Sequence, residues 1–592
     1  MKKRVVTKVL AALTAISTLM LTGCSPELMM GYYQMPQEQA AEEAAPAEAP
    51  AEEAAATEEE PVFEGPQDIM ILFTSDIHCG VDQGLGLDGV VQIRETLEKQ
   101  GNLTLLVDNG DSVQGEPIGT VTSGEAVIDL MNDAGYDIGI PGNHDFDYGI
   151  DQFFALTERA NFPYLSCNFN KEGELVLPPY LIKEIGDHKI GFVGVTTPRT
   201  LVTSTPKYFQ DADGNFIYGF MQDSTGQGVY DAVQKAVDDA RADGADYVIL
   251  MGHIGNEQDM APYTCVDILS NTTGIDAMVD GHSHDTEQMT VKNKDGEDVP
   301  RSACGTKLSG LGYVKISAED GSVSTGLYSW GNKESPAQLF GYSNAMQDNL
   351  EEATVALNEE LSVVVAQTAV DLTINDPVEV DAEGHPIRLI RRMETNLGDL
   401  CADAYREQLE TDVALINGGG IRATIEKGDI TLADILKVHP FGNMASVYEV
   451  TGQMLLDALE WGARVTPDEL GGFLQVSGMS YEIHTYIDTP CITDENGMFA
   501  GIEGERRVQN VMVGDEPIDP DKTYTLASID YIIKDHGDGF AMFDDAETVL
   551  DGIKIDNQML IDYIVDYLGG MVGENYEDPY GQGRIVEFEE AP

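Results

Sequence analysis

The chain has 592 residues, and its 34 Lys and Arg against 103 Asp and Glu give a formal net charge of −69. This length exceeds what one hydrophobic core supports, so at least two domains are expected. A surface this negative repels DNA, RNA and anionic lipid headgroups, which makes nucleic-acid polymers poor partners. A small anionic substrate therefore needs a site that concentrates positive charge.

Residues 1–24 have the pattern of a lipoprotein signal peptide. Basic residues precede an apolar run over 9–22, which is shorter than the ~20 residues that span a bilayer. The run ends in Leu-Thr-Gly-Cys, which resembles a bacterial lipobox with Cys24 as the acylation site. The alternative is an ordinary signal peptide with an incidental cysteine. We expect an extracytoplasmic lipoprotein on a bacterial cell surface, attached to the membrane through lipid on Cys24 alone.

Residues 25–66 are predicted to form a disordered linker. The stretch from 37 to 66 consists largely of Ala, Glu and Pro and contains no Lys or Arg. Such a segment buries little and stays extended through self-repulsion. The six cysteines after Cys24 are scattered, so neither a zinc ribbon nor a disulfide scaffold is indicated.

Residues 67–335 have the pattern of an α/β domain. Short apolar runs at 69–73, 103–107, 190–195 and 247–251 alternate with helix-like stretches. Buried strands with covering helices give this alternation, and such folds place functional side chains just after the strands.

A connecting helix is predicted within residues 336–365, followed by a second domain over 366–592. The helix has one apolar face, formed by Met346, Leu350, Leu357, Leu361 and Val364. The second domain is expected to begin with an extended segment at 370–374 and to end with another at 584–588.

Metal-ligand side chains follow five of the predicted strands. The motifs are Asp76-x-His78, Gly-Asp111, Gly-Asn143-His144, Gly-His253 and Gly-His282-Ser-His284. Each motif alone is weak, because a single strand-end Asp or His is usually structural. Half of the ten histidines fall in these motifs, however. Imidazole, carboxylate and carboxamide ligands together favour a hydrolytic transition-metal site over calcium or structural zinc.

This ordered series resembles the calcineurin-like metallophosphoesterases. The resemblance implies a β-sandwich flanked by helices that holds two divalent metal ions; Zn, Mn, Co and Fe are not distinguished. Two cations about 3.5–4 Å apart clamp a phosphoryl group and activate water for in-line attack. By resemblance, one metal is assigned Asp76, His78 and His284, the other is assigned Asn143, His253 and His282, and Asp111 bridges them.

The Gly-Asn-His motif continues as Asp145-Phe146-Asp147. In the 5'-nucleotidase branch of this family, the His and the Asp three residues later form a catalytic dyad, which here implies His144 and Asp147. Asp145 is ranked below Asp147 and could be a structural carboxylate.

The second half of the chain resembles the C-terminal substrate domain of 5'-nucleotidases. The motifs are Arg391-Arg-Met-Glu-Thr-Asn-Leu-Gly-Asp-Leu, Asn417-Gly-Gly-Gly-Ile-Arg422, His-Pro-Phe441-Gly and Gly-Asp538-Gly-Phe. The resemblance spans residues 68–588 and implies a separate α+β domain joined by the helix. It assigns substrate binding to Arg391, Asn417, Arg422, Phe441 and Asp538.

One position departs from that pattern. The family's second base-stacking aromatic falls at Ile532, with Tyr531 beside it. Either Tyr531 takes over or the base site is one-sided. Arg388 and Arg392 are interpreted as surface charges.

These patterns predict a two-metal phosphohydrolase that removes phosphate from nucleoside 5'-monophosphates, with one domain closing on the other. A 2',3'-cyclic-nucleotide phosphodiesterase and a nucleotide-sugar hydrolase are alternatives with the same ligand set. A non-catalytic surface lipoprotein that binds nucleotides is the alternative from another class. No protein partner is inferred.

Overall fold

The computed structural model describes residues 65, 67–256, 260–329, 345–380 and 386–591. The predicted signal peptide with Cys24, nearly all of the linker, and the domain boundary at 335 lie outside the described residues. Among the residues described, no helix has the length and apolar character needed to cross a membrane.

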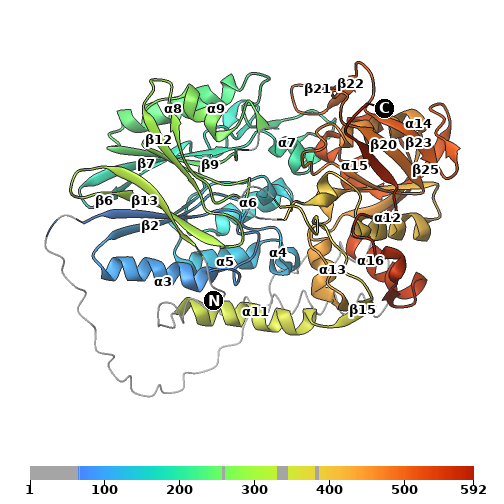
Figure 1. Ribbon diagram of the computed structural model, residues 1–592. Coiled ribbons are helices and arrows are strands. Elements are labelled where there is room, and N and C mark those ends of the chain that lie inside the picture. Colours follow the sequence, from blue (N-terminus) through green and yellow to red (C-terminus); the bar gives the residue numbers. More distant parts are fainter. Residues whose placement is uncertain (1–64, 66, 257–259, 330–344, 381–385, 592) are drawn as a thin grey trace, which may run out of the picture.

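The N-terminal domain is a sandwich of two sheets, as predicted. Figure 1 shows the sheets stacked, with α8 and α9 over one outer face and α3, α5 and α11 under the other. The five-stranded sheet has the order β14-β13-β1-β2-β3 and the six-stranded sheet the order β11-β12-β10-β9-β7-β6. The bounds of the first sheet are β1 Ile69–Thr74, β2 Leu103–Asp108, β3 Ile138–Gly139, β13 Gly310–Ile316 and β14 Val323–Ser329. Those of the second are β6 Tyr180–Ile185, β7 His188–Thr196, β9 Tyr247–His253, β10 Ala277–Asp280, β11 Gln288–Lys292 and β12 Asp298–Ala303.

The central strands are apolar throughout because both of their faces are buried. In β1, Ile71 and Phe73 point between the sheets, where they meet Ile249 of the facing sheet. Met70 and Leu72 point the other way, into the cluster formed with the outer helices. The helices of this domain are α3 Gly86–Lys99, α4 Pro117–Thr122, α5 Glu125–Ala134, α6 Ile150–Arg159, α7 Thr200–Thr203, α8 Gln227–Ala242 and α9 Cys265–Asn271. A small sheet joins β4 Asn170–Lys171, β5 Glu174–Leu175 and β8 Tyr218–Gly219.

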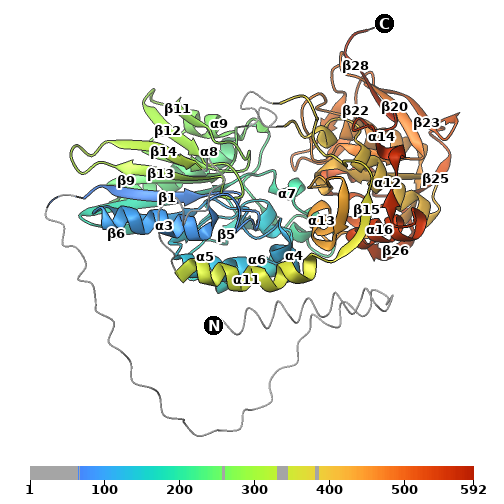
Figure 2. The ribbon, with the colours of Figure 1, turned by 60° about the horizontal axis from the view of Figure 1, so that its bottom comes forward.

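The connecting helix is α11, Ala345–Leu361, which lies against α3 and α5 (Figure 2). The predicted apolar face is buried at Met346, Leu350, Leu357 and Leu361. The prediction was wrong at Val364, which opens β15 (Val364–Thr368) and is 50% exposed. The extended segment predicted at 370–374 is also not a strand; only Leu372 forms an isolated bridge, with Ile425.

The C-terminal domain is α+β, built on the sheet β19-β16-β25-β18-β26. The helices are α12 Asn396–Leu409, α13 Leu432–Val438, α14 Gly452–Gly462, α15 Asp530–Ile533 and α16 Asp556–Asp562. The main sheet comprises β16 Val413–Asn417, β18 Met444–Thr451, β19 Leu474–Ser477, β25 Thr523–Ile529 and β26 Glu547–Ile555. A second sheet comprises β20 Met479–His484, β23 Val508–Val513, β24 Glu516–Pro517 and β28 Ile585–Phe588. Smaller sheets pair β15 with β17 Gly428–Thr431 and β27 Met571–Val572, and β21 Cys491–Thr493 with β22 Phe499–Ile502.

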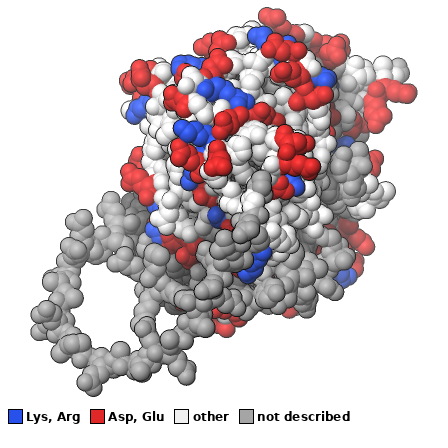
Figure 3. Space-filling model, turned by 90° about the vertical axis from the view of Figure 1, so that its left-hand side faces the viewer, with Lys and Arg blue, Asp and Glu red and all other residues white. Residues whose placement is uncertain are grey.

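The two domains meet directly (Figures 1 and 2). Thr120 donates a hydrogen bond to the carbonyl of Pro440 (3.0 Å), and Lys207 forms an ion pair with Asp535 (3.0 Å). Thr120 belongs to α4 and Lys207 to the segment after α7, so these parts of the N-terminal domain face the C-terminal domain. On the face shown in Figure 3, groups of Asp and Glu side chains are scattered over the described part, with Lys and Arg among them.

Candidate active site

The sheets bring the ligand motifs together at one edge of the sandwich. The parallel neighbours β1 and β2 lead into Asp76, His78 and Asp111, while the parallel neighbours β9 and β10 lead into His253, His282 and His284. Several of these residues have left-handed backbone, namely Asp76 (φ 51°), His78 (φ 43°), Asp111 (φ 57°), His282 (φ 81°) and His284 (φ 60°). Such strain costs of order 1–3 kcal/mol per residue and is typical of functional sites.

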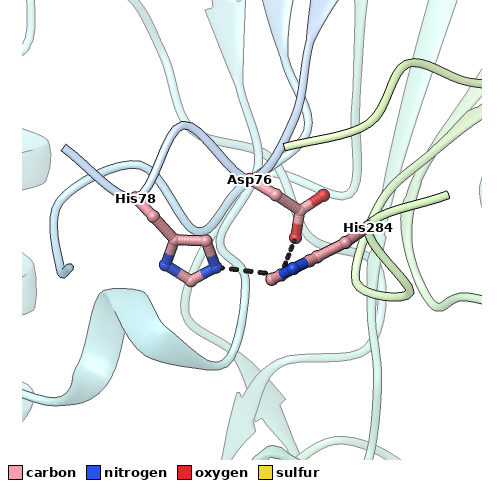
Figure 4. Close-up of side chains that lie close together, drawn as sticks. All are labelled: Asp76, His78 and His284. Carbon is pink, nitrogen blue, oxygen red and sulfur yellow. Dashed lines mark hydrogen bonds and ion pairs between the residues drawn. The ribbon is translucent and has the colours of Figure 1, made fainter. Parts of the chain in front are cut away.

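The ligand atoms form two compact groups. One contains Asp76, His78 and His284, and the other contains Asp111, His253 and His282; within each, the ligand atoms lie within 4.8 Å of one another. In the first group, Nε2 of His78 and Nε2 of His284 are 3.0 Å apart, and Nε2 of His284 is 3.5 Å from Asp76 Oδ1 (Figure 4). Three side chains from two loops thus converge on one point.

Asp111, a member of the second group, also reaches towards the first. Its Oδ2 is 3.2 Å from Nε2 of His253 and 3.8 Å from Nε2 of His78. This is the placement that a bridging carboxylate needs. Asn143 lies in the cavity beside Asp111, and its buried Oδ1 has no hydrogen-bond partner among the described residues.

The ring orientations and the buried acceptor fit divalent metals. Nδ1 of His78 donates to the carbonyl of Gln114 (2.9 Å) and Nδ1 of His253 to that of Asn109 (2.7 Å), so in both rings it is Nε2 that faces the other ligand side chains. Burial lowers the pKa of His78, His282 and His284, which favours the neutral rings that bind metals. His253 differs, because burial would lower its pKa but Asp111 and Asp76 outweigh burial and raise the pKa to about 10, so this ring must release its proton when a metal binds. A cation would also satisfy the unpaired oxygen of Asn143, which is otherwise costly to bury.

Asp145 ties the ligand loops together. Its carboxylate accepts hydrogen bonds from the backbone N–H groups of Gly142 (2.7 Å), Asp111 (2.9 Å) and Ser112 (3.2 Å). It therefore fixes the Gly-Asn-His loop against the Gly-Asp loop without lining the cavity. These contacts agree with the interpretation of Asp145 as a structural carboxylate.

A buried ion pair that the sequence analysis missed supports the histidine loops. Arg301 of β12 contacts Asp280 at 2.8 Å, and both side chains are 0% exposed. The other oxygen of Asp280 accepts hydrogen bonds from the N–H groups of Ile254 (3.1 Å), Gly255 (3.3 Å) and Gly281 (3.0 Å). The pair therefore holds the segments next to His253 and His282. Asp280 immediately precedes the Gly-His-Ser-His motif, but no sequence signal points to Arg301.

His144 and Asp147 form a hydrogen-bonded pair. Nδ1 of His144 is 2.6 Å from Asp147 Oδ2, and Ser204 donates to the other oxygen of Asp147 (2.9 Å). The backbone N–H of His144 donates to Asp111 Oδ1 (2.7 Å), which links the pair to the ligand groups. Burial would lower the pKa of His144, but Asp147 and Asp111 outweigh it and raise the pKa.

One cavity of about 230 Å³ joins these residues to the C-terminal domain. His144, Asp147 and His284 line it on one side. On the other side it is lined by all five residues predicted to bind substrate, Arg391, Asn417, Arg422, Phe441 and Asp538. Asn417 donates to Asp538 (3.0 Å), and the guanidinium carbon of Arg422 lies 5.7 Å from the centre of the Phe441 ring.

The aromatic position left open by the sequence is occupied by Tyr531. Tyr531 lines the cavity, whereas Ile532 is fully buried in the core. The Tyr531 ring packs so closely on Gly537 that a Cβ there would lie 2.1 Å from it, so any other residue at this position would displace the ring. The cavity thus carries two aromatic side chains, Phe441 and Tyr531.

The interpretation of Arg388 as a surface charge was wrong. Arg388 lines the cavity and forms an ion pair with Glu469 (2.5 Å). Arg392 instead pairs with the exposed Glu379 (2.8 Å). Arg199 of the N-terminal domain also lines the cavity and was not predicted. The only hint in the sequence that Arg199 belongs to the site is its position shortly after the end of strand β7.

Two family models match the chain. The model described as calcineurin-like phosphoesterase matches residues 69–286, and that of the 5'-nucleotidase C-terminal domain matches residues 364–545. The chain belongs to the 5'-nucleotidase family of calcineurin-like phosphoesterases. It is accordingly a metal-dependent phosphoric ester hydrolase, and the non-catalytic alternative is set aside.

Curated relatives and a solved structure support the assignment. The 5'-nucleotidase of Vibrio cholerae and protein UshA of Escherichia coli are each 26% identical, over 80% of this chain and 84% of the relative. The trifunctional nucleotide phosphoesterase protein YfkN of Bacillus subtilis is 27% identical over 89% of this chain, which spans only 35% of that relative. The crystal structure of the 5'-nucleotidase precursor from Thermus thermophilus is 25% identical, with a TM-score of 0.71 over 88% of this chain and 100% of that one.

Proposed function

We propose that this family member is an extracytoplasmic enzyme that removes phosphate from nucleoside 5'-monophosphates at a centre of two divalent metals. The observation that carries the proposal is the single cavity. It joins both ligand groups and the His144–Asp147 pair to arginines and to two aromatic side chains. The ligand groups and the arginines suit a phosphate, Asp538 in the same cavity suits a ribose, and the aromatic rings suit a base.

Each part of the substrate has a matching group in the cavity. Arg391 and Arg422 present planar, permanently charged guanidinium groups that suit a phosphate. Asp538, oriented by Asn417, accepts hydrogen bonds from ribose hydroxyls. Phe441 and Tyr531 offer ring faces on which a base stacks.

The chemical step divides between metals and protein. Divalent metals at such a centre polarise the phosphoryl oxygens and make water nucleophilic near neutral pH. Asp147, itself held by Ser204, fixes the ring of His144 at the edge of the ligand groups. His144 then donates a hydrogen bond to charge that develops on the phosphoryl group or on the leaving oxygen.

The substrate class is tested by a panel of AMP, 2',3'-cyclic AMP and UDP-glucose, assayed with and without a chelator. We expect AMP to give the highest kcat/KM and the chelator to abolish turnover. His144→Ala should lower kcat by ~10²–10⁴-fold, as loss of a general acid or base does. A preference for 2',3'-cyclic AMP would identify a cyclic-nucleotide phosphodiesterase, and a preference for UDP-glucose a nucleotide-sugar hydrolase. Both substrates belong in the panel because one relative is named a trifunctional nucleotide phosphoesterase. Turnover in fully metal-free protein would contradict the metal mechanism.

Base stacking is tested at Tyr531. Tyr531→Leu removes an aromatic face worth ~1 kcal/mol, so KM for AMP should rise about fivefold. Ribose 5-phosphate provides the control, because it keeps the phosphate and the ribose but lacks the base. Its kcat/KM should not change. An equal loss with both substrates would mean that Tyr531 supports the cavity instead of the base.

We also propose that the enzyme is anchored by lipid on Cys24, on the strength of the Leu-Thr-Gly-Cys sequence. Acyl chains there would hold the enzyme at the outer side of the membrane, where it meets extracellular nucleotides. Fractionation of cells that express wild-type or Cys24→Ala protein tests this. Equal amounts of both proteins in the membrane fraction would contradict it.

A further inference from the structure

A second cavity, of about 160 Å³, opens beside the first at the junction of the two domains. His78 and His284 of the first ligand group line it, and among the described residues no Phe, Tyr or Trp does. We call it the basic cavity. Its cationic lining residues are Lys307, Arg388, Arg391, Arg422 and Lys437.

Glu116 is the one carboxylate among the described residues that line the basic cavity, and it pairs with lysines of both domains. Glu116 Oε1 is 2.6 Å from Nζ of Lys307, and Oε2 is 3.5 Å from Nζ of Lys437. The Glu116 side chain is only 11% exposed. Arg388 is also paired with Glu469, so two acids face the five cations and a local excess of positive charge remains, in a chain whose net charge is −69.

The two cavities share His284, Arg388, Arg391 and Arg422, which therefore lie between them. Burial and the neighbouring Arg388 lower the pKa of Arg422 to about 10, because like charges crowd in a dry site. An anion bound on either side of these arginines would relieve that repulsion. The reacting phosphate occupies one side in the proposed function, which leaves the basic cavity on the other.

We propose that the basic cavity is a second phosphate subsite, continuous with the proposed 5'-nucleotidase site and resting on that function. Lys307 and Lys437 supply mobile point charges, while the shared arginines supply planar donors. A phosphate group reaches it from either of two sources. One source is the orthophosphate product, leaving the centre on the side away from the nucleoside. The other is the additional phosphate of a nucleoside diphosphate.

The double variant Lys307→Gln/Lys437→Gln tests the subsite in the metal-loaded enzyme. Orthophosphate and ADP are each measured as competitors of AMP hydrolysis. The variant removes two charge-assisted contacts, so the inhibition constant of the phosphate source that uses the cavity should rise by about tenfold or more. KM for AMP should stay within about twofold, because AMP carries no second phosphate. Lys235→Gln/Lys292→Gln is the matched control, since both of its lysines pair with acids remote from either cavity.

The outcomes separate the two sources. A change for orthophosphate alone identifies a product subsite, and a change for ADP alone identifies a subsite for a second phosphate. Unchanged constants for both competitors, or equal changes in the control variant, would overturn the proposal.

Glu116→Gln tests the same idea with the opposite sign. This substitution removes the carboxylate that occupies Lys307 and Lys437, so the competitor affected above should bind several-fold more tightly. Weaker binding would contradict the proposal. If the wild type does not hydrolyse AMP, the proposed function fails separately. In that case, calorimetric titration of orthophosphate into the same variants still shows whether the basic cavity binds phosphate.

Discussion

Asp111→Asn should lower kcat/KM for AMP by ~10³-fold or more, because the carboxylate that reaches both ligand groups contributes several kcal/mol of metal-dependent stabilisation. Asp111 Oδ2 is 3.2 Å from Nε2 of His253 and 3.8 Å from that of His78, so an amide in its place faces both groups without charge. Metal content, measured by mass spectrometry after dialysis against a weak chelator, should fall along with activity.

Asp108→Asn is the matched control for that experiment. Asp108 is as deeply buried and lies three residues away, but its contacts are with Thr74, Ser112 and the N–H of Gly110. Burial and the neighbouring Asp145 raise the pKa of Asp108 to about 8, so at neutral pH its carboxyl already resembles an amide. This variant should keep its metals and most of its activity. Equal losses in both variants would mean that the fold, and not the position of Asp111, explains the effect.

The ligand groups could be predicted from the sequence because each ligand sits directly after a buried strand. Parallel neighbours end at the same edge of a sheet, so Asp76 and Asp111 are brought together by local pattern and topology alone. The glycine before Asp111 approaches Gly142 so closely that a Cβ there would lie 2.3 Å from the Gly142 nitrogen. The close approach of the two loops therefore explains why a glycine precedes Asp111 in this motif.

The errors have a different cause, namely contacts between distant segments. Val364 continues the helical spacing of α11, yet pairing with β17 draws it into β15. In the sequence, Arg388 cannot be distinguished from a surface arginine. Its partner at the cavity wall is Glu469, which lies 81 residues further along the chain. Propensity and periodicity describe neighbours within about one helical turn, so they cannot report such partners.

The lining of the cavity was predicted in part, because it comes from both domains. Tyr531 and Ile532 are adjacent in sequence, and only the packing of α15 decides which of them faces the cavity. Arg199 contributes from the N-terminal domain to the same cavity, whereas the residues predicted to bind substrate all lie in the other domain. Motif spacing determines neither which of two adjacent side chains faces a cavity nor which residues of another domain reach it.

Arg301→Met should cost ~3–5 kcal/mol in the free energy of unfolding, because it leaves Asp280 buried without its cation. Arg301 and Asp280 are both 0% exposed, and Asp280 also accepts backbone N–H groups beside His253 and His282. The displaced histidine loops should then lower metal affinity ~10–100-fold, as loss of a supporting contact does. Urea unfolding and competition with a chelator measure the two effects separately.

Two further variants show whether Arg301 positions the histidines or only stabilises the domain. Arg159→Met breaks a partly exposed pair with Asp129 and should cost no more than ~1 kcal/mol without changing metal affinity. Asp280→Asn/Arg301→Met removes both buried charges, so stability should partly recover. Metal affinity should remain low in this double variant, because the ion pair that holds the loops is still absent. If its metal affinity recovered fully, or if Arg301→Met lost stability while binding metal normally, the histidine loops would not depend on Arg301 for their position.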